Sequence, residues 1–444
     1  MLKNIKNIQL NPPLFLTIGF GLLILIGGCL LSLGIFTRSG ESIGFINAIF
    51  TAASATCVTG LVVVNTAEFW NVGGQIIILI LIQIGGLGIM TLATLFPMIL
   101  RKRIGLTSRQ IIREQLNVDS FSGIVKLLKY VIYFSLTCEL IGALLLSTVF
   151  VPEYGLLNGA WKSIFHAISA FCNAGFDNIG NSIEPYRNNV IVNFTLMALI
   201  TIGGLGFGVT SEILSGKGRK KYSTHTKLVL LTSAILSLGG GLIFFIAEYT
   251  NPGTIGSEGF FAKGMQALFQ SVIARTAGFN SIDIGAMRDT SAFFMILLMF
   301  AGGSPGSTAG GLKTTTVGVL FASTFSLIRG ENKTTLFNKR VPTDIILKSL
   351  ALVIISSMLV MIISLILTVT EHFDFIDVLF EVVSAYGTVG VSRGITPNLT
   401  AFGRILITLT MYAGRIGPLT MAFAFGKKRS KSRIDFPDAN ISVG

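Results

Sequence analysis

The chain alternates between long apolar runs and short polar connections. Five of the apolar runs contain no Asp, Glu, Lys or Arg. A helix needs roughly 20 apolar residues to cross the hydrocarbon core of a bilayer, and each of these runs is long enough. The pattern therefore predicts several membrane-spanning helices. The charge-free runs cover residues 14–36, 76–100, 190–211, 228–247 and 349–370.

Between the apolar runs, a second pattern occurs four times. Each copy has an apolar or aromatic residue ten positions before a glycine, small residues in between and an apolar residue after the glycine. In the third copy Leu268 rather than Phe269 holds the ten-residue spacing. A second glycine cluster follows each copy after about 25 residues, inside an apolar run. The four copies cover residues 49–61, 164–176, 268–279 and 379–391.

The repeat predicts a structural unit: a spanning helix, a short amphipathic helix of about a dozen residues, a polar glycine-containing turn and another spanning helix. Four units give an all-α integral membrane protein with eight spanning helices, arranged as four pseudo-symmetric repeats around one central pore. The predicted boundaries are 1–105, 106–222, 223–335 and 336–426 for the four repeats, and 427–444 for a cytoplasmic C-terminal tail.

Composition and charge agree with a membrane protein. Only 12% of the residues are charged and the mean hydropathy is +0.74, whereas about a quarter of a soluble chain is charged. The net charge of +13 comes from short basic clusters in alternate connections, so it indicates topology rather than nucleic-acid binding. By the positive-inside rule, both termini are cytoplasmic in a multi-pass protein of the cell membrane. The clusters lie at 3–6, 101–113, 217–221, 329–340 and 427–433.

The polar turns suggest ion permeation. A twelve-residue helix cannot cross the membrane, so the turn behind it lies at membrane depth, where irregular backbone must be buried in protein or line a water-filled path. Four turns on one axis would solve this together, because their carbonyl oxygens can replace the water around a cation. The C-terminal ends of the short helices, which are partially negative, would point toward that cation. Glycine supplies the left-handed backbone conformation that such turns need.

Four motifs carry a resemblance to a known family: TCVTGL at 56–61, NAGF at 173–176, RTAGFN at 275–280 and GTVGV at 387–391. With these, the chain resembles the Trk/Ktr/HKT superfamily of potassium transporters, most closely the KtrB/KtrD-type membrane subunit, over residues 10 to 440. The resemblance implies a pseudo-fourfold pore that binds potassium at filter carbonyls, and glycine at position 60 favours potassium over sodium. The expected filter residues are Val58, Thr59, Gly60, Asn173, Ala174, Gly175, Thr276, Ala277, Gly278, Thr388, Val389 and Gly390.

The third repeat contains an unusual stretch at 301–316, with five glycines and one proline inside an apolar run. These residues weaken helical structure, and the resemblance implies an intramembrane loop that plugs the pore below the filter. The alternative is a helix kinked at Pro305. Arg415 lies inside the last apolar run, where a charge costs about 3 kcal/mol. In the resembled family the matching arginine faces the pore and contacts the loop; the alternative is a side chain that snorkels from a helix end.

The expected gate includes residues of the loop and Arg415, and Lys313 either shares this role or lies nearer the cytoplasm. The gate residues are Gly302, Gly303, Ser304, Gly306, Ser307, Thr308, Gly310, Gly311, Lys313 and Arg415.

Other polar residues are better explained as scaffold. We expect His166 to be packed in a short helix and Arg275 to brace the third turn. The four cysteines lie in apolar segments without metal-like spacing, and no catalytic arrangement is recognisable, so we expect neither an enzyme nor a cofactor on this chain. A secondary transporter that rocks between two states would need inverted repeats and a buried acidic ion site, whereas the repeats here are same-handed and Glu139 is a single acid.

The predicted inner connections are short, so control of the pore would come from another protein. The resemblance implies a cytosolic nucleotide-binding regulatory ring of the RCK type, docked on the basic inner connections, with the nucleotide on that partner. It also implies a homodimer of two pore subunits side by side in the membrane. Nucleic acid is not an expected partner.

Overall fold

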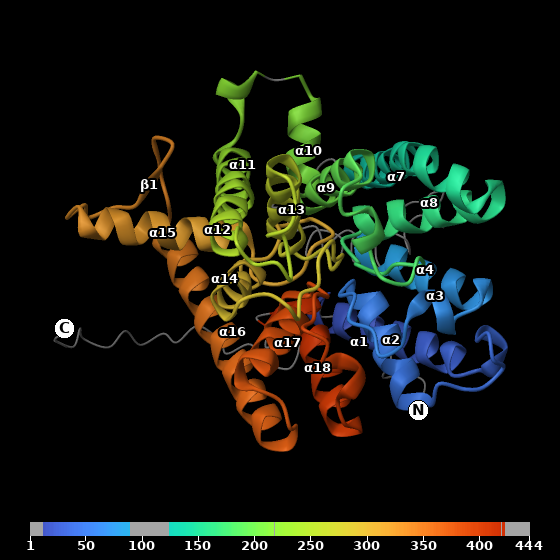
Figure 1. Cartoon of the computed structure of the whole chain (residues 1–444). Coiled ribbons are helices and arrows are strands. Elements are labelled where there is room, and N and C mark those ends of the chain that lie inside the picture. Colours follow the sequence, from blue (N-terminus) through green and yellow to red (C-terminus); the bar gives the residue numbers. More distant parts are fainter. Residues whose placement is uncertain (1–11, 89–123, 217, 419, 422–444) are drawn as a thin grey trace.

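The computed structural model describes residues 12–88, 124–216, 218–418 and 420–421, and they are almost entirely helical (Figure 1). The four predicted repeats follow one another around a central group of loops, with the chain colours running in order around this centre. A small hairpin of β1 (Thr335–Leu336) and β2 (Lys339–Arg340) projects from the helices. The basic clusters at 3–6, 101–113 and 427–433 and the predicted tail lie outside the described residues.

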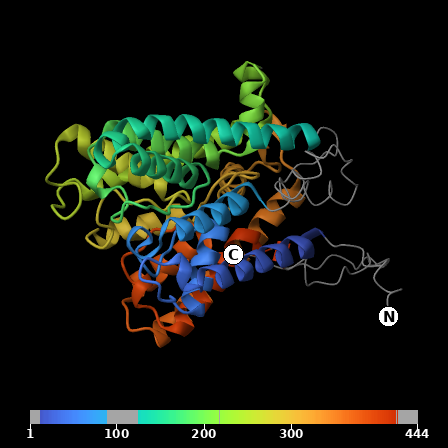
Figure 2. The ribbon, with the colours of Figure 1, turned by 90° about the vertical axis from the view of Figure 1, so that its right-hand side faces the viewer.

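Each repeat begins with a long apolar helix. These are the four unbroken helices in the described part of the chain that are long and apolar enough to cross a bilayer. In the third repeat a π-helical turn at Ile235–Gly239 keeps the helix continuous from Thr224 to Glu248. Figure 2 shows α1 (dark blue) and α7 (teal) extending in the same direction. The long helices are α1 (Pro12–Leu31), α7 (Ile124–Tyr154), α11 with α12 (Thr224–Ala234, Gly240–Glu248) and α16 (Thr343–Thr370).

The expected short helices are present, and each is too short to cross a membrane. Their lengths are 13 to 16 residues, and each ends just before one of the four glycine turns. Each contains a fully buried phenylalanine at the corresponding position of the repeat, and these side chains are Phe50, Phe165, Phe269 and Phe380. The short helices are α2 (Phe45–Cys57), α8 (Leu156–Phe171), α13 (Phe260–Ile273) and α17 (Phe375–Gly387).

The second helix of each repeat stops at its glycine cluster, so neither the run at 76–100 nor the run at 190–211 forms a single unbroken helix; residues 89–100 lie outside the described part of the chain. α9 (Val190–Gly204) and α10 (Phe207–Leu214) are bent by 102°. The cause is a glycine with a positive φ, which ends an α-helix. This glycine is Gly206, with φ 92°. A glycine with a similar φ follows the second helix of the first repeat (Gly88, 89°) and of the fourth repeat (Gly417, 87°). The second helices are α4 (Val72–Leu87), α9, α14 (Asp289–Phe300) with α15 (Thr314–Ile328), and α18 (Ala401–Ile416).

If the bent pair counts as one span, the described residues contain up to five apolar spans by length and composition. Eight crossings therefore stay a prediction. The loop at 301–313 separates α14 from α15, so the described structure has an interrupted segment here rather than one kinked helix.

Glycines in the second helices lie directly against the ends of the short helices. A Cβ atom added to Gly85 would lie 1.9 Å from the carbonyl oxygen of Thr56, and one added to Gly414 would lie 1.9 Å from that of Tyr386. In the second repeat, a Cβ on Gly203 would lie 2.0 Å from the Phe171 carbonyl oxygen. These approaches are possible only for a residue without a side chain, so the glycine clusters set the distance between the two helices.

Neighbouring repeats are also joined by polar contacts. The contacts link the first repeat to the second, the second to the third, the third to the fourth and the fourth back to the first, so the chain closes on itself. They are Asn65 Nδ2 to Gly180 O at 2.8 Å, Asn280 N to Ser182 Oγ at 2.8 Å, Arg393 Nη1 to Asp289 Oδ1 at 3.1 Å and Arg404 Nη1 to Asn47 Oδ1 at 2.6 Å.

The close approach at Gly85 predicts a large effect of one methyl group. We expect Gly85→Ala to destabilise the protein by about 1–3 kcal/mol or more, because the new Cβ meets backbone that cannot move aside. The matched control is Gly208→Ala in α10, where an added Cβ has no neighbour within 4 Å. Thermal unfolding of the detergent-solubilised protein would measure both. Equal melting temperatures for the two variants would contradict this packing.

Candidate functional site

The four glycine turns share an unusual backbone conformation. The residue two positions before each glycine has a positive φ, although none of the four is itself a glycine. Left-handed backbone costs about 1–3 kcal/mol for a non-glycine residue and persists only where the surroundings impose it. The surrounding structure therefore imposes the same left-handed backbone conformation on all four turns. The angles are 59° at Val58, 61° at Asn173, 72° at Thr276 and 51° at Thr388.

The four glycines lie next to one another at the centre of the fold. Each has a positive φ, and each lies against the carbonyl oxygen that precedes the glycine of the next repeat in chain order. The last repeat contacts the first in the same way, so the contacts form a closed circle. Distances from an added Cβ to the facing oxygen are 2.5 Å for Gly60 to Ala174, 2.8 Å for Gly175 to Ala277, 2.8 Å for Gly278 to Val389 and 2.0 Å for Gly390 to Thr59.

The third turn is one residue shorter than the others. Phe269, not Leu268, occupies the buried position of the other three phenylalanines, so the residue matched by the ten-residue spacing is not the structural equivalent. The hydrogen bonds agree: in every repeat, the carbonyl four residues after the phenylalanine accepts from the residue before the glycine. These bonds are Thr59 N to Ser54 O at 2.8 Å, Ala174 N to Ser169 O at 2.7 Å, Ala277 N to Ile273 O at 3.0 Å and Val389 N to Ser384 O at 2.8 Å.

Three serines brace the turns, and sequence reasoning gave them no role. The hydroxyls of Ser54 and Ser384 each accept a hydrogen bond at 3.1 Å, from the amides of Gly60 and Gly390. Ser169 instead donates to the Phe176 carbonyl at 2.7 Å. The third repeat has Ile273 at this position. The signal was present in the sequence as a serine four residues after the phenylalanine in three of the four copies.

The loop between α14 and α15 binds the C-terminal ends of helices in the second repeat. Its amides at Ser304 and Thr308 donate to the last carbonyls of α9, at 3.0 Å for Gly204 and 3.2 Å for Gly203. The Thr308 hydroxyl donates to the Phe171 carbonyl at the end of α8, at 3.2 Å. Helix ends leave such carbonyls without intrahelical partners, and the loop supplies the missing donors.

The loop also lies against the fourth repeat and is bonded within itself. A Cβ added to Gly310 would lie 2.2 Å from the Thr388 hydroxyl oxygen, and one added to Gly311 would lie 3.1 Å from Gly387 Cα. Small residues are therefore needed where the loop passes the fourth turn. Internal and flanking bonds are Thr314 N to Gly303 O at 3.0 Å, Ser307 Oγ to Ser304 O at 2.6 Å and Phe207 N to Gly306 O at 2.8 Å.

Two positive side chains hold adjacent carbonyls of the loop. Arg415 donates through Nη1 to the Thr308 carbonyl, and through Nη2 to the Gly85 and Gly86 carbonyls at the end of α4, at 2.5 and 3.3 Å. The Lys313 ammonium donates to the Ala309 carbonyl at 2.8 Å. Both side chains therefore bind backbone oxygens inside the protein, close to the second and fourth turns.

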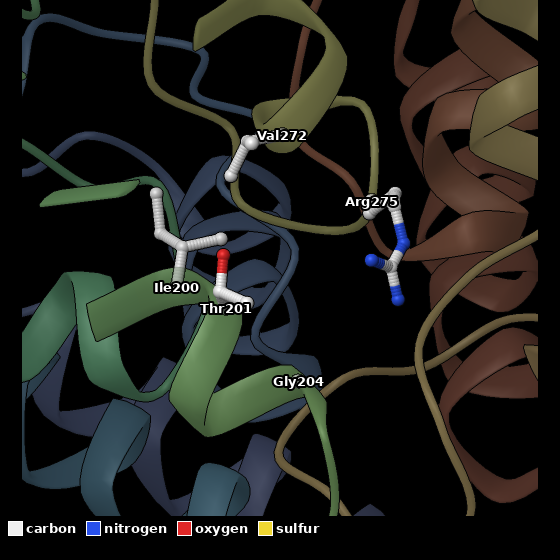
Figure 3. Close-up of a pocket in the computed structure, with 5 residues that line it drawn as sticks. All are labelled: Ile200, Thr201, Gly204, Val272 and Arg275. Atoms are coloured by element: carbon white, nitrogen blue, oxygen red, sulfur yellow. The ribbon is translucent and has the colours of Figure 1, made fainter. Parts of the chain in front are cut away.

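Arg275 contacts the long helix of its own repeat. Its guanidinium donates to the hydroxyls of Ser233 and Ser237, each at 3.1 Å, near the π-helical turn. A small pocket separates Val272 and Arg275 from Ile200, Thr201 and Gly204 of α9 (Figure 3). The bonds join the third turn to the long helix, as bracing requires.

His166 is fully buried and packed against aromatic side chains. Its Nδ1 lies 2.8 Å from the Lys162 carbonyl oxygen, and its ring stacks on Phe279 with centroids 6.0 Å apart. Phe279 directly follows Gly278, so the histidine supports the third turn from the second repeat.

Comparison with known proteins gives a consistent result. The family described as "TrkH: Cation transport protein" matches residues 20–434. "Ktr system potassium uptake protein B" of Bacillus subtilis is 44% identical, covering 100% of this chain and 99% of that protein. "Potassium/sodium uptake protein NtpJ" of Enterococcus hirae is 42% identical over the same shares. The crystal structure of the potassium transporter TrkH from Vibrio parahaemolyticus has the same fold, with a TM-score of 0.75 at 17% identity over 95% of this chain and 86% of that one.

The family consists of cation transporters rather than enzymes, and the apolar helices agree with a place in a membrane. The match extends over nearly the whole sequence and includes all four glycine turns. The chain belongs to the TrkH cation transport protein family.

Proposed function

We propose that this chain is the pore-forming membrane subunit of a potassium uptake system, and that potassium crosses through the circle of four glycine turns. The observation that carries the proposal is the closed circle itself, in which each glycine lies against a carbonyl oxygen of the next repeat. Relatives at 44% and 36% identity are named potassium uptake proteins of Ktr systems, which supports potassium as the transported ion.

The physical basis is replacement of hydration water by backbone oxygens. A potassium ion that enters the circle would lose part of its water shell and gain peptide carbonyls in return. The four short helices end directly before the turns, so the partial negative charges of their C-termini favour a cation at this point. In this proposal the filter consists of the three residues that end in each glycine. They are Val58–Gly60, Asn173–Gly175, Thr276–Gly278 and Thr388–Gly390.

The full topology belongs to the proposal. Eight crossings in four pseudo-symmetric repeats would place the filter on the outer side and both termini in the cytoplasm of a cell-membrane protein. Support comes from the turn conformation that recurs in all four repeats and from the alternation of basic clusters along the chain.

We further propose that the gate is the loop at 301–313, which makes up most of the stretch predicted at 301–316; residues 314–316 form the start of α15. The loop contacts the end of α8, shortly before the second turn, and it contacts the fourth turn; Arg415 joins it to the end of α4. Arg415 and Lys313 would oppose the passage of a cation in two ways. Their positive charges raise the electrostatic barrier, and their hydrogen bonds hold the loop in place. The gate would open when Arg415 and Lys313 release the loop carbonyls and bind other partners.

A cytosolic RCK-type ring that binds nucleotide is the proposed regulator, and two pore subunits would form a homodimer beside it. The word "system" in the relatives' names supports more than one component. Among the described residues, the basic connection around the β1–β2 hairpin would offer Lys339 and Arg340, which are exposed, to an acidic partner.

The filter proposal predicts a loss of ion discrimination when any of the four glycines is replaced. Gly60→Ser and Gly390→Ser should abolish potassium uptake or reduce its preference over sodium, because the new side chain displaces a carbonyl of the adjacent repeat. Gly175→Ser and Gly278→Ser should act alike. Uptake of rubidium with competing sodium, in a host that lacks its own potassium uptake, measures the effect. Unchanged discrimination in all four variants would refute the filter.

The bracing serines predict a graded effect. Ser54→Ala and Ser384→Ala leave a buried glycine amide without its acceptor, which costs about 1–3 kcal/mol, so both stability and potassium selectivity should fall. Ser349→Ala is the matched control, since this buried serine bonds only within α16, to the Ile345 carbonyl at 2.8 Å. If the control and the two turn variants behaved identically in rubidium uptake and thermal unfolding, the bracing role would be wrong.

The gate proposal predicts a gain of flux. Arg415→Ala removes the bonds to the loop and to α4, so ion flux through reconstituted protein should rise without any cytosolic partner. Shortening the loop between Gly302 and Gly311 should do the same. Flux into proteoliposomes, normalised to correctly inserted protein, is the measurement. An equal or lower flux in both variants would show that the loop does not close the pore.

A further inference from the structure

A carboxyl group inside the second repeat has no place in the pore described above. Glu139 lies in the middle of α7, on the buried stripe that includes Val131, Ser135 and Leu146, and it is 5% exposed. A charged side chain at the centre of a spanning helix costs about 3 kcal/mol, and such residues are usually paired and functional. Its partners therefore indicate what it does.

The partner of Glu139 is Gln83 of α4. The Gln83 amide Nε2 lies 2.9 and 3.2 Å from the two carboxyl oxygens of Glu139. Its other end, Oε1, accepts a hydrogen bond from the Cys172 thiol at 3.4 Å, directly after α8. Gln83 thus joins three elements of two repeats: α4, α7 and the end of a short helix.

The segment that follows Gln83 is the one that Arg415 binds. Gly85 and Gly86 belong to the last turn of α4, and their carbonyls accept from the Arg415 guanidinium at 2.5 and 3.3 Å. The last four carbonyls of a helix have no intrahelical partners and carry partial negative charge, so a guanidinium is a suitable cap. Arg415 also binds the Thr308 carbonyl of the loop.

The path from Glu139 to the loop is therefore continuous. It runs through the Gln83 side chain, one turn of α4, and the Arg415 side chain. A hydrogen bond weakens strongly when donor and acceptor move apart by a few tenths of an ångström beyond 3.2 Å. A small shift of the last turn of α4 would release Arg415 from Gly86, whose bond is already long.

We propose that Glu139 and Gln83 are positioning residues for the gate: their hydrogen bond fixes the last turn of α4 in the place where Arg415 can bind both α4 and the loop. This inference rests on the proposed gating function of Arg415. The contribution of Glu139 is an acceptor at a fixed position, so an uncharged acceptor of the same shape can replace it.

The test measures rubidium uptake by full-length protein in proteoliposomes without a partner. We expect Glu139→Leu and Gln83→Leu to raise uptake on the order of tenfold, the effect of losing one buried hydrogen bond on a two-state equilibrium. Glu139→Gln keeps an amide oxygen for Gln83 Nε2 and should restore low uptake. Ser135→Ala is the control, because its hydroxyl bonds only to the Val131 carbonyl of the same helix, at 2.6 Å.

Combination with Arg415→Ala separates this inference from the gate itself. Glu139→Leu should add nothing to the uptake of Arg415→Ala, because both changes act through the same contact. If Arg415→Ala raises uptake while Glu139→Leu and Gln83→Leu do not, the positioning role is wrong and the gate stands. Full additivity of Glu139→Leu with Arg415→Ala, or equal uptake for the Leu and Gln variants at 139, would also overturn it. If Arg415→Ala has no effect, the gate fails and this inference fails with it.

Discussion

A peptide group inside a membrane protein must find a hydrogen-bond partner, and this constraint organises the whole centre of the molecule. Short helices and interrupted helices meet here, and each ends with free carbonyls. The structure satisfies them from three sources: amides of the loop cap α9, the Arg415 guanidinium caps α4, and the turns bond back to their own short helices. Around the closed circle, the carbonyl oxygen before each of the four glycines lies against the glycine of the neighbouring repeat.

The same constraint explains why so many glycines surround the centre. Backbone must approach backbone within contact distance at the turns, at the second helices and along the loop, and a Cβ at Gly85, Gly203 or Gly414 would collide with a carbonyl oxygen. The glycine clusters are therefore needed for close packing of backbone against backbone as much as for conformational freedom. In the third repeat the loop between α14 and α15 meets the fourth turn through Gly310 and Gly311 in the same way.

Much of this could be predicted from spacing alone. The four short helices and the turns that follow them were predicted from the repeat, because one geometry imposes one pattern of residues. The interruption was predicted, with bounds 301–316, from five glycines and one proline and from the family resemblance. The bend at Gly206 could not be predicted, since the run at 190–211 is apolar throughout and hydropathy does not report a change of direction. The shorter third turn was misaligned because Leu268 is as apolar as the buried Phe269. The contact between Arg415 and the loop was expected from the family resemblance. The partners of Arg415 in α4 and those of Gln83 lie hundreds or tens of residues away, and only the folded chain brings them together.

The contact between Arg404 and Asn47 has a consequence for synthesis. Asn47 is synthesised 357 residues before Arg404, so the first repeat leaves the ribosome long before its neighbour on this side exists. During that interval α2 lacks the contacts that it makes with α18 in the folded chain. Closure of the circle of repeats thus depends on α18, and a chain truncated before this helix would leave α2 and Asn47 without their partners.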